Sequence, residues 1–217
     1  MDGGSVLKPK GRRPRALPSP RTIVAQSVLA PHAPPDVLAL PHPDWLYQEL
    51  TVTGDADALW SFRQAAAGAG HVPWAYDYDA LEEHWLSLML NQPGRRISLQ
   101  GAKIVARETK EAFRDEHEEA CSWVGRSKAV PLDLHQLVPV PWEVLRLGPD
   151  APASLRWLWR HWATTWPLRR LDRLPCPAGA WRVGFWSADW TPWPAIAACR
   201  ARWPALAFRL RIAYAAG

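Results

Sequence analysis

Residues 45–54 read W-L-Y-Q-E-L-T-V-T-G, and this stretch decides the fold. Apolar side chains alternate along it with aromatic or polar ones, which is the period-two pattern of a half-buried β-strand. Gly54 ends the strand, and Asp55 is a favourable N-cap for a helix over 56–67. The segment therefore predicts a strand followed directly by a helix.

Three later segments also predict strands, at 132–138, 181–187 and 205–214. The last alternates most strictly, with a large apolar residue at every second position, and a helix over 194–203 is predicted before it. We expect one antiparallel sheet in the spatial order fourth, first, third and second strand, with the helices 56–67 and 194–203 on one face. This is the split βαβ order of a ferredoxin-like α+β fold.

The remaining segments predict an insert and a tail. Residues 72–125 contain two charged amphipathic stretches with a turn at Pro93-Gly94, so a helical hairpin is expected as an insertion in the fold. Residues 1–43 contain nine prolines and few large apolar side chains, which is typical of a disordered, Pro-rich basic tail. The predicted organisation is a tail over 1–43 and a single domain over 44–217.

The composition fits one globular domain. The chain has 217 residues, of which 48% are hydrophobic and 22% charged, so burial can offset the entropy of ordering most of it. The formal net charge is +5, but residues 1–44 carry +3 of it, so overall charge is weak support for a nucleic-acid partner. The 15 tryptophans indicate either a heavily packed core or a surface on which flat ligands stack.

Cysteine usage and hydropathy favour a cytoplasmic protein. Cys121, Cys176 and Cys199 form no C-x-x-C pair, and their odd number argues against a secreted disulfide framework. No apolar run approaches the ~20 residues of a membrane span, and no targeting signal is recognisable. We therefore expect a cytoplasmic location and no contact with a membrane.

Four ordered blocks of the sequence are similar to one known family. They are Trp45 to Gly54; Leu132 to Pro141, which ends P-V-P; Trp162 to Trp166, which reads W-A-T-T-W; and Phe185 to Pro194, followed by R-W-P-A-L-A-F at 202–208. Together they resemble the YubB-type ferredoxin-like domains, which commonly begin with Pro-Asn-Trp and run into Leu-Thr-Val-Thr-Gly. The family usually has Gly at the place of Ala163, and it reads Ala-Trp without the intervening Asp189.

The resemblance implies a ferredoxin-like fold and a bacterial setting in which the protein is associated with a plasmid or a phage. It implies no catalytic residue, and the insert 72–125 lies outside the common core of the family. We expect a non-catalytic binding module associated with a mobile element, with single-stranded nucleic acid or another protein as its partner.

Familiar catalytic and metal-binding patterns are missing from the sequence. His117 and Cys121 stand four residues apart on a predicted helix, but no third ligand stands near them in the sequence, so no metal site is expected. No phosphate-binding loop and no G-x-S-x-G nucleophile motif is present. The sequence therefore predicts no cofactor and favours a protein that is not an enzyme.

One cluster of mixed chemistry remains. It combines indoles, hydroxyls, a histidine and a carboxylate from two short segments: His161, Trp162, Thr164, Thr165 and Trp166, with Ser187, Asp189, Trp190, Pro192 and Trp193. Such a set can line a ligand pocket, or it can form a Trp-lined loop that closes the end of the sheet. The alternative function is an enzyme in which His161 or His135 works with Asp189 as an acid/base pair.

Strand alternation also predicts what the sheet presents on the face away from its helices. That face would carry Tyr47, Arg182, Trp186, Arg209 and Arg211, together with His135 on the segment 132–138. Tyr47 and Trp186 would lie side by side on the two central strands, as aromatic residues do on the base-stacking face of an RNA recognition motif. Glu49 places a negative charge in the same surface, and the helical insert could instead cover it. A nucleic-acid surface and a covered face are both open alternatives.

Overall fold

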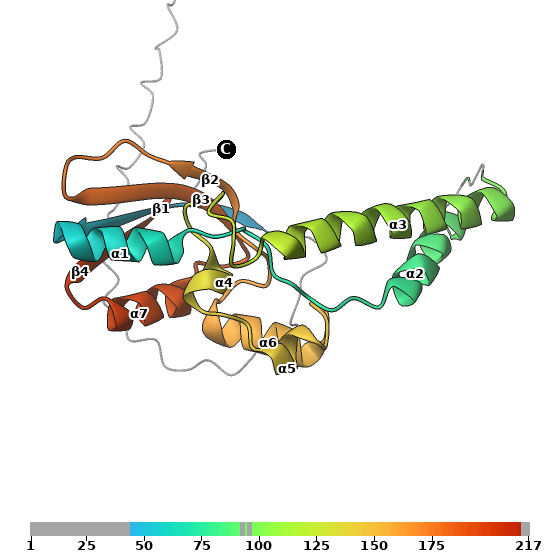
Figure 1. Ribbon diagram of the computed structural model, residues 1–217. Helices are drawn as coiled ribbons and strands as arrows, with labels where there is room; N and C mark the ends of the chain where they lie inside the picture. Colours follow the sequence, from blue (N-terminus) through green and yellow to red (C-terminus); the bar gives the residue numbers. More distant parts are fainter. Residues whose placement is uncertain (1–43, 92–93, 95–96, 214–217) are drawn as a thin grey trace, which may run out of the picture. The chain divides into compact units, whose positions relative to one another are not determined.

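The computed structural model describes residues 44–91, 94 and 97–213 (Figure 1). In chain order the elements are β1 (Trp45–Gly54), α1 (Ala56–Ala66), α2 (Tyr78–Leu90), α3 (Leu99–Trp123), α4 (Leu134–Leu137), α5 (Trp142–Leu145), α6 (Pro152–His161), β2 (Arg169–Arg173), β3 (Ala180–Ala188), α7 (Trp193–Arg202) and β4 (Leu206–Ala213). The predicted tail, residues 1–43, lies outside the described residues. The described part is an α+β structure, as expected.

The four strands form one antiparallel sheet in the order β2-β3-β1-β4. β1 is central, with Leu50 opposite Val183 of β3 on one side and Leu210 of β4 on the other. This is the split βαβ order of a ferredoxin-like fold. The predicted neighbours of the first strand are confirmed.

The prediction of a strand at 132–138 is wrong. The Asp133 carboxylate accepts a hydrogen bond from the amide of His135 and begins the short helix α4 instead. Apolar and polar residues of this segment are both buried, so its alternation does not come from a strand with one solvent-exposed face. The fourth strand is β2, a short edge strand whose sequence R-R-L-D-R carries no apolar alternation.

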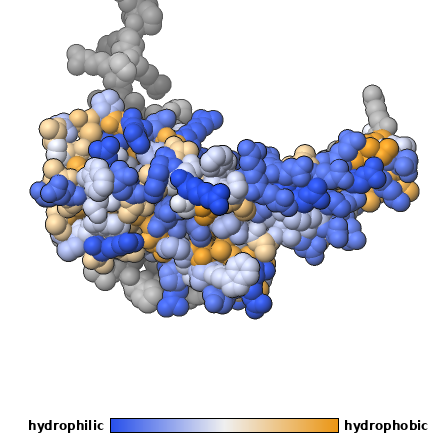
Figure 2. All heavy atoms as spheres, in the orientation of Figure 1, coloured by the Kyte–Doolittle hydropathy of each residue, from blue (hydrophilic) through white to orange (hydrophobic). Residues whose placement is uncertain are grey.

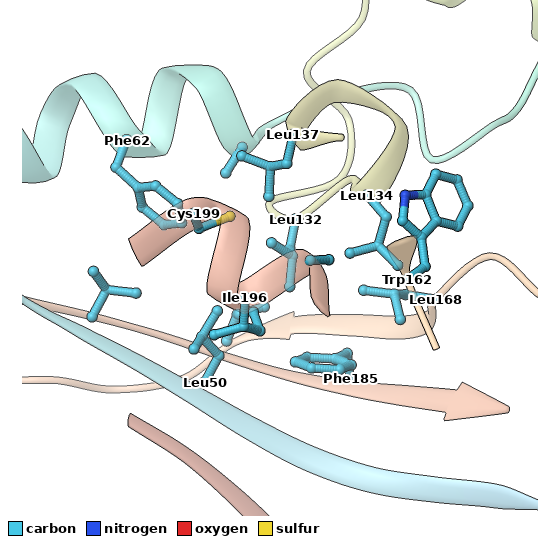
Figure 3. Close-up of a cluster of buried hydrophobic side chains, with 14 of the residues drawn as sticks. Leu50, Phe62, Leu132, Leu134, Leu137, Trp162, Leu168, Phe185, Ile196 and Cys199 are labelled. Atoms are coloured by element: carbon cyan, nitrogen blue, oxygen red, sulfur yellow. The ribbon is translucent and has the colours of Figure 1, made fainter. Parts of the chain in front are cut away.

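The core lies between the sheet and the helices α1 and α7, which cover the same face (Figures 1 and 3). Leu50 of β1 and Phe185 of β3 point toward Phe62 of α1 and Ile196 and Cys199 of α7. Complete burial of side chains of this size stabilises the fold by about 1.5–3 kcal/mol each. This packing determines which face of the sheet is inside, and it leaves the opposite face for other contacts.

Helices α4, α5 and α6 pack beside α1 and α7 at one end of the core. Trp162 follows α6, is only 1% exposed, and donates its indole N–H to the carbonyl of Val138 at 3.0 Å. Ala163 comes next with a φ of 56°. That value lies in the left-handed region, which glycine adopts with less strain than alanine does.

The helical hairpin predicted at 72–125 is confirmed. Its helices α2 and α3 lie side by side and pack mainly against each other (Figure 1). Phe113 of α3 makes edge-on ring contacts with Tyr78 and Trp85 of α2, whereas the visible surface of α3 is mostly hydrophilic (Figure 2). None of the described helices is long and apolar enough to cross a membrane.

Candidate functional site

No described helix packs on the face of the sheet away from α1 and α7, and the side chains of β1 on that face are partly exposed. Of the two alternatives for this face, the structure favours the open one. Its side chains come from facing positions on the four strands, and we call them the open sheet face: Trp45, Tyr47, Glu49, Thr51, Arg169, Asp172, Arg182, Gly184, Trp186, Arg209 and Arg211.

Two aromatic rings lie side by side at the centre of this face. Tyr47 of β1 and Trp186 of β3 are directly opposite in the strand register, and their ring centroids are 5.4 Å apart with 53° between the planes. Gly184 leaves room for the tyrosine, because a Cβ atom there would press against the ring, 3.1 Å from its Cζ. Both rings are half-buried, so part of each remains open to solvent. The predicted adjacency of Tyr47 and Trp186 is confirmed.

A second aromatic group adjoins this pair, and sequence reasoning missed it. Arg169 of β2 pairs with Trp186 in the sheet, and its guanidinium lies 4.4 Å from the ring centroid of Trp45 and 5.4 Å from that of Trp166. The two indoles make an edge contact at 6.5 Å. Cation–π contacts are worth about 0.5–1 kcal/mol at exposed sites. Trp166, expected in a pocket with Trp162, is therefore held against the open sheet face.

The carboxylate of Glu49 binds two of the predicted arginines. It accepts hydrogen bonds of 2.9 Å from both Arg182 and Arg211. Burial acts to raise the pKa of Glu49, but the hydrogen bonds and charges of Arg211 and Arg182 outweigh it and hold that pKa below its ordinary value. Arg209 is exposed and forms no ion pair with any described residue. Four arginines thus share the open sheet face with two carboxylates, which leaves it net positive.

The residues of the predicted pocket do not converge on one site. Trp162 and Thr164 are buried in the core, whereas Trp190 is 55% exposed. Thr165 and Trp193 are half-buried, and His161 stacks on Trp157 of the same helix at 4.5 Å. A cavity of about 10 Å³ beside Trp162 has room for no more than one water molecule. The geometry matches the second interpretation, a Trp-lined loop that closes the end of the sheet.

The acid/base pair considered for an enzyme is not formed by the described residues. Asp189 has a φ of 63°, and its carboxylate accepts a hydrogen bond from the Asp44 amide at 3.2 Å. Burial raises the pKa of Asp189. His135 is buried in α4 and not exposed on the sheet as predicted; its Nδ1 accepts from the Val140 amide at 3.2 Å, and burial lowers its pKa. Within the described ranges, no hydrogen bond or ion pair joins Asp189 to His135 or His161.

Three potential metal ligands lie together where the segment after α1 meets α3. His71 Nε2 is 3.1 Å from His117 Nδ1 and 3.7 Å from Cys121 Sγ. Burial, and then the neighbouring His117, lower the pKa of His71, which favours a neutral ring with a free lone pair. The sequence argument that His117 and Cys121 lack a third partner is wrong, because His71 lies beside them. His71 stands 46 residues before His117, so the spacing of ligands along the chain does not reveal it.

The loop that carries His71 is held by its glycines and by Asp133. Gly68 exchanges two backbone hydrogen bonds with Val130, and the Gly70 amide donates to Asp133 Oδ2 at 2.9 Å. Gly68 has no room for a side chain, since a Cβ atom would meet the Asp133 carboxylate and approach Gln136 Cγ to 2.5 Å. These contacts determine where the chain leaves α1 and therefore where His71 lies.

Comparisons with known proteins leave the family open. No family model matches the chain, and no curated protein matches it. Among solved structures, the crystal structure of a protein api92 from Yersinia pseudotuberculosis, with the family model DUF1281, is similar with a TM-score of 0.46 and 13% sequence identity, over 80% of this chain and 91% of that chain. A likeness at this level assigns neither a family nor a function.

Proposed function

We propose that this chain is a non-catalytic binding module that binds single-stranded nucleic acid on its open sheet face. The observation that carries the proposal is the Tyr47–Trp186 pair, which occupies the two central strands of a sheet face that no described helix covers. Every nucleobase has a π-face, so such rings stack bases with little regard to their sequence.

The energetics of the surface support this assignment. Stacking of a base on an aromatic side chain is worth about 1–3 kcal/mol, and Trp45 and Trp166 extend the aromatic surface toward β2. Arg209 is exposed without an ion-pair partner among the described residues and is placed to meet a phosphate. Glu49 opposes binding, because it occupies Arg182 and Arg211. The arrangement favours moderate, salt-sensitive binding.

The wider setting belongs to the same proposal: a cytoplasmic bacterial protein associated with a plasmid or phage and related to the YubB-type domains. Its support is the order of the four sequence blocks and one backbone detail. Ala163 stands where that family usually has Gly, and its φ of 56° is a conformation for which glycine is the default residue. A protein partner on the same face is the competing outcome, which the following experiment separates.

The test is binding of a fluorescent single-stranded oligonucleotide across a salt series. Trp186→Ala should weaken binding about 5- to 140-fold, which corresponds to the loss of about 1–3 kcal/mol of stacking. Arg209→Ala should lower the salt slope by about 0.7, the value for one phosphate contact on a single strand.

Two variants on the helices of the opposite face provide matched controls. Trp60→Ala on α1 removes an indole that is 63% exposed, and Arg200→Ala on α7 removes an exposed arginine; both should bind like the wild type. Absence of salt-sensitive binding by the wild type at micromolar concentration would refute the proposal. Equal losses in the test and control variants would do the same.

A further inference from the structure

The cluster of His71, His117 and Cys121 lies apart from the open sheet face, and the two distances from His71 Nε2 to the other ligands match those of a zinc site. With the usual Zn–N and Zn–S bond lengths, a tetrahedral site places two nitrogens roughly 3.3 Å apart, and a nitrogen and a sulfur roughly 3.6 Å apart. The corresponding distances are 3.1 Å between His71 Nε2 and His117 Nδ1, and 3.7 Å between His71 Nε2 and Cys121 Sγ. One donor atom from each of the three residues lies within 4.8 Å of the others. Cys121 Sγ lies 3.3 Å from His117 Nε2, the nitrogen that faces Trp74, so the thiol has to turn toward the Nδ1 side of the ring to complete the site.

A second observation concerns the orientation of His117. Its Nε2 lies 2.9 Å from the carbonyl oxygen of Trp74. A carbonyl can only accept, so Nε2 carries the proton and Nδ1 presents a lone pair toward His71. Histidines that bind metals commonly donate their other ring N–H to a backbone carbonyl in this way, because the bond fixes the tautomer and the ring orientation.

The ring is also held from the sides. Tyr76 packs edge-on against His117 at 4.8 Å, and Phe113 stacks parallel to it at 6.1 Å. His117 is 7% exposed, while His71 and Cys121 are half-buried, so one ligand is fixed within the structure and two remain reachable from solvent. The His117 ring is therefore preorganised, and the other two ligands are open to a metal ion.

We propose that His71 Nε2, His117 Nδ1 and Cys121 Sγ bind one Zn²⁺ ion, with a water molecule in the fourth position. Two imidazoles and a thiolate suit a borderline-soft transition metal, whereas Mg²⁺ and Ca²⁺ require oxygen ligands. Binding releases the thiol proton of Cys121 to solvent, and His71 carries its remaining proton on Nδ1. No redox step is involved.

The ion would link two parts of the chain that otherwise share few contacts. His71 belongs to the loop after α1, which is held by Asp133, while His117 and Cys121 lie in the last two turns of α3. Metal binding would therefore fasten the base of the helical hairpin to the sheet domain. Because metal binds the folded state, it should raise the thermal stability by an amount that grows with the logarithm of its free concentration above Kd.

The experiment uses the full-length protein, reduced, stripped with a chelator and titrated with Co²⁺ as a spectroscopic probe. We expect about one Co²⁺ ion per chain and a thiolate-to-cobalt charge-transfer band in the near ultraviolet. Zn²⁺ should displace the cobalt and thereby remove the band. Cys121→Ser should abolish the band. Removal of a residue that only hydrogen-bonds a metal ligand weakens metal binding about 10–100-fold. His71→Ala removes a ligand itself and should weaken cobalt binding by more than this.

Matched controls are Cys176→Ser and His84→Ala, since both residues are exposed and lie outside the cluster; each should retain the band and the affinity. If a cluster variant fails to fold by circular dichroism, the charge-transfer band of the wild type decides. A wild type without that band would overturn the proposal, and so would a band that persists in a folded Cys121→Ser variant. Zinc that raises the unfolding midpoint of wild type and His71→Ala equally would also overturn it.

Discussion

Replacement of Glu49 by glutamine tests the electrostatics of the open sheet face most directly. The substitution keeps the size and shape of the side chain but removes the charge that binds Arg182 and Arg211. The Glu49 side chain is 13% exposed, and those of Arg182 and Arg211 are 33% and 67% exposed. The first ion pair is therefore sheltered and the second is largely solvated.

These exposures set the expected loss of stability. A sheltered charge-assisted hydrogen bond is worth about 1.5–3 kcal/mol, whereas an exposed ion pair contributes at most about 1 kcal/mol. Since glutamine keeps one acceptor oxygen, Glu49→Gln should lower the free energy of unfolding by about 1–3 kcal/mol in total. For a domain of this size that is a fall of roughly 2–10 °C in Tm.

The difference should depend on pH. The pKa of Glu49 in the folded protein lies below its ordinary value of 4.5. At a pH between these two pKa values, the unfolded chain binds more protons than the folded chain does, so the free energy of unfolding rises with pH. The contribution of the carboxylate is therefore complete above pH 4.5 and is lost as the pH falls through the folded pKa. Wild type and Glu49→Gln should become equally stable in acid.

Binding should change in the opposite direction. Release of Arg182 and Arg211 makes two guanidinium groups available, and each new phosphate contact adds about 0.7 to the salt slope for a single strand. If each of the two new arginine–phosphate contacts is worth about 0.2–1 kcal/mol, as an exposed ion pair is, affinity should increase about 2- to 30-fold. The assay is the oligonucleotide titration over a salt series, beside thermal unfolding at several pH values.

The control is Glu83→Gln on α2, which makes the same change in net charge at an exposed position outside the sheet. It should alter neither binding nor its salt slope appreciably. Our reasoning would be refuted if Glu49→Gln lost stability as expected but bound no more tightly than Glu83→Gln. In that case the arginines of this face serve the fold alone.

Three further predictions concern the scaffold. Gly68→Ala should lower the free energy of unfolding by about 1–3 kcal/mol, because a Cβ atom there meets the Asp133 carboxylate; an unchanged denaturant midpoint would contradict this. Ala163→Gly should leave stability unchanged or raise it by up to about 1 kcal/mol, since relief of the left-handed backbone outweighs the added chain entropy; a fall in Tm of several degrees would argue against it. The pKa of His135 lies below 6.5 because the ring is buried, so its contribution is complete above pH 6.5 and is lost as the pH falls toward the folded pKa. His135→Asn keeps an acceptor for the Val140 amide but does not titrate, so it should lose less stability than the wild type between neutral pH and pH 5. Equal losses in the two proteins would rule this out.

The sequence predicted the inner strands because their environment is asymmetric. Leu50 and Val52 are fully buried, while Tyr47 and Glu49 on the same strand face partly into solvent, and this contrast produces the period-two pattern. The same contrast predicts that Tyr47 and Trp186 lie side by side, as they do. At 132–138 the contrast is absent, because Asp133 and its apolar neighbours are all buried, so the alternation there predicts a strand that does not form.

The missed features share a physical cause. β2 is an edge strand of five residues with little burial on either face, so its sequence shows no apolar alternation. Because the strand is not predicted, the contacts of Arg169 with Trp45 and Trp166 are not predicted either. His71 joins His117 only through the tertiary fold. Neither the role of Glu49 as a bridge between two arginines nor the dispersal of the predicted pocket can be inferred without the packing of elements distant in the chain.

The central position of β1 has a consequence for synthesis of the protein. Its two partners, β3 and β4, are the last strands in the described chain, and 125 residues separate Gly54 from Ala180. At ribosomal rates of about 5–20 residues per second, roughly 6–25 s pass before β1 meets a neighbour. During that interval Leu50 and Val52 have no sheet to enter and an unpaired apolar strand is accessible to other chains. β1 is therefore the segment of the nascent protein for which we expect chaperone protection to matter most.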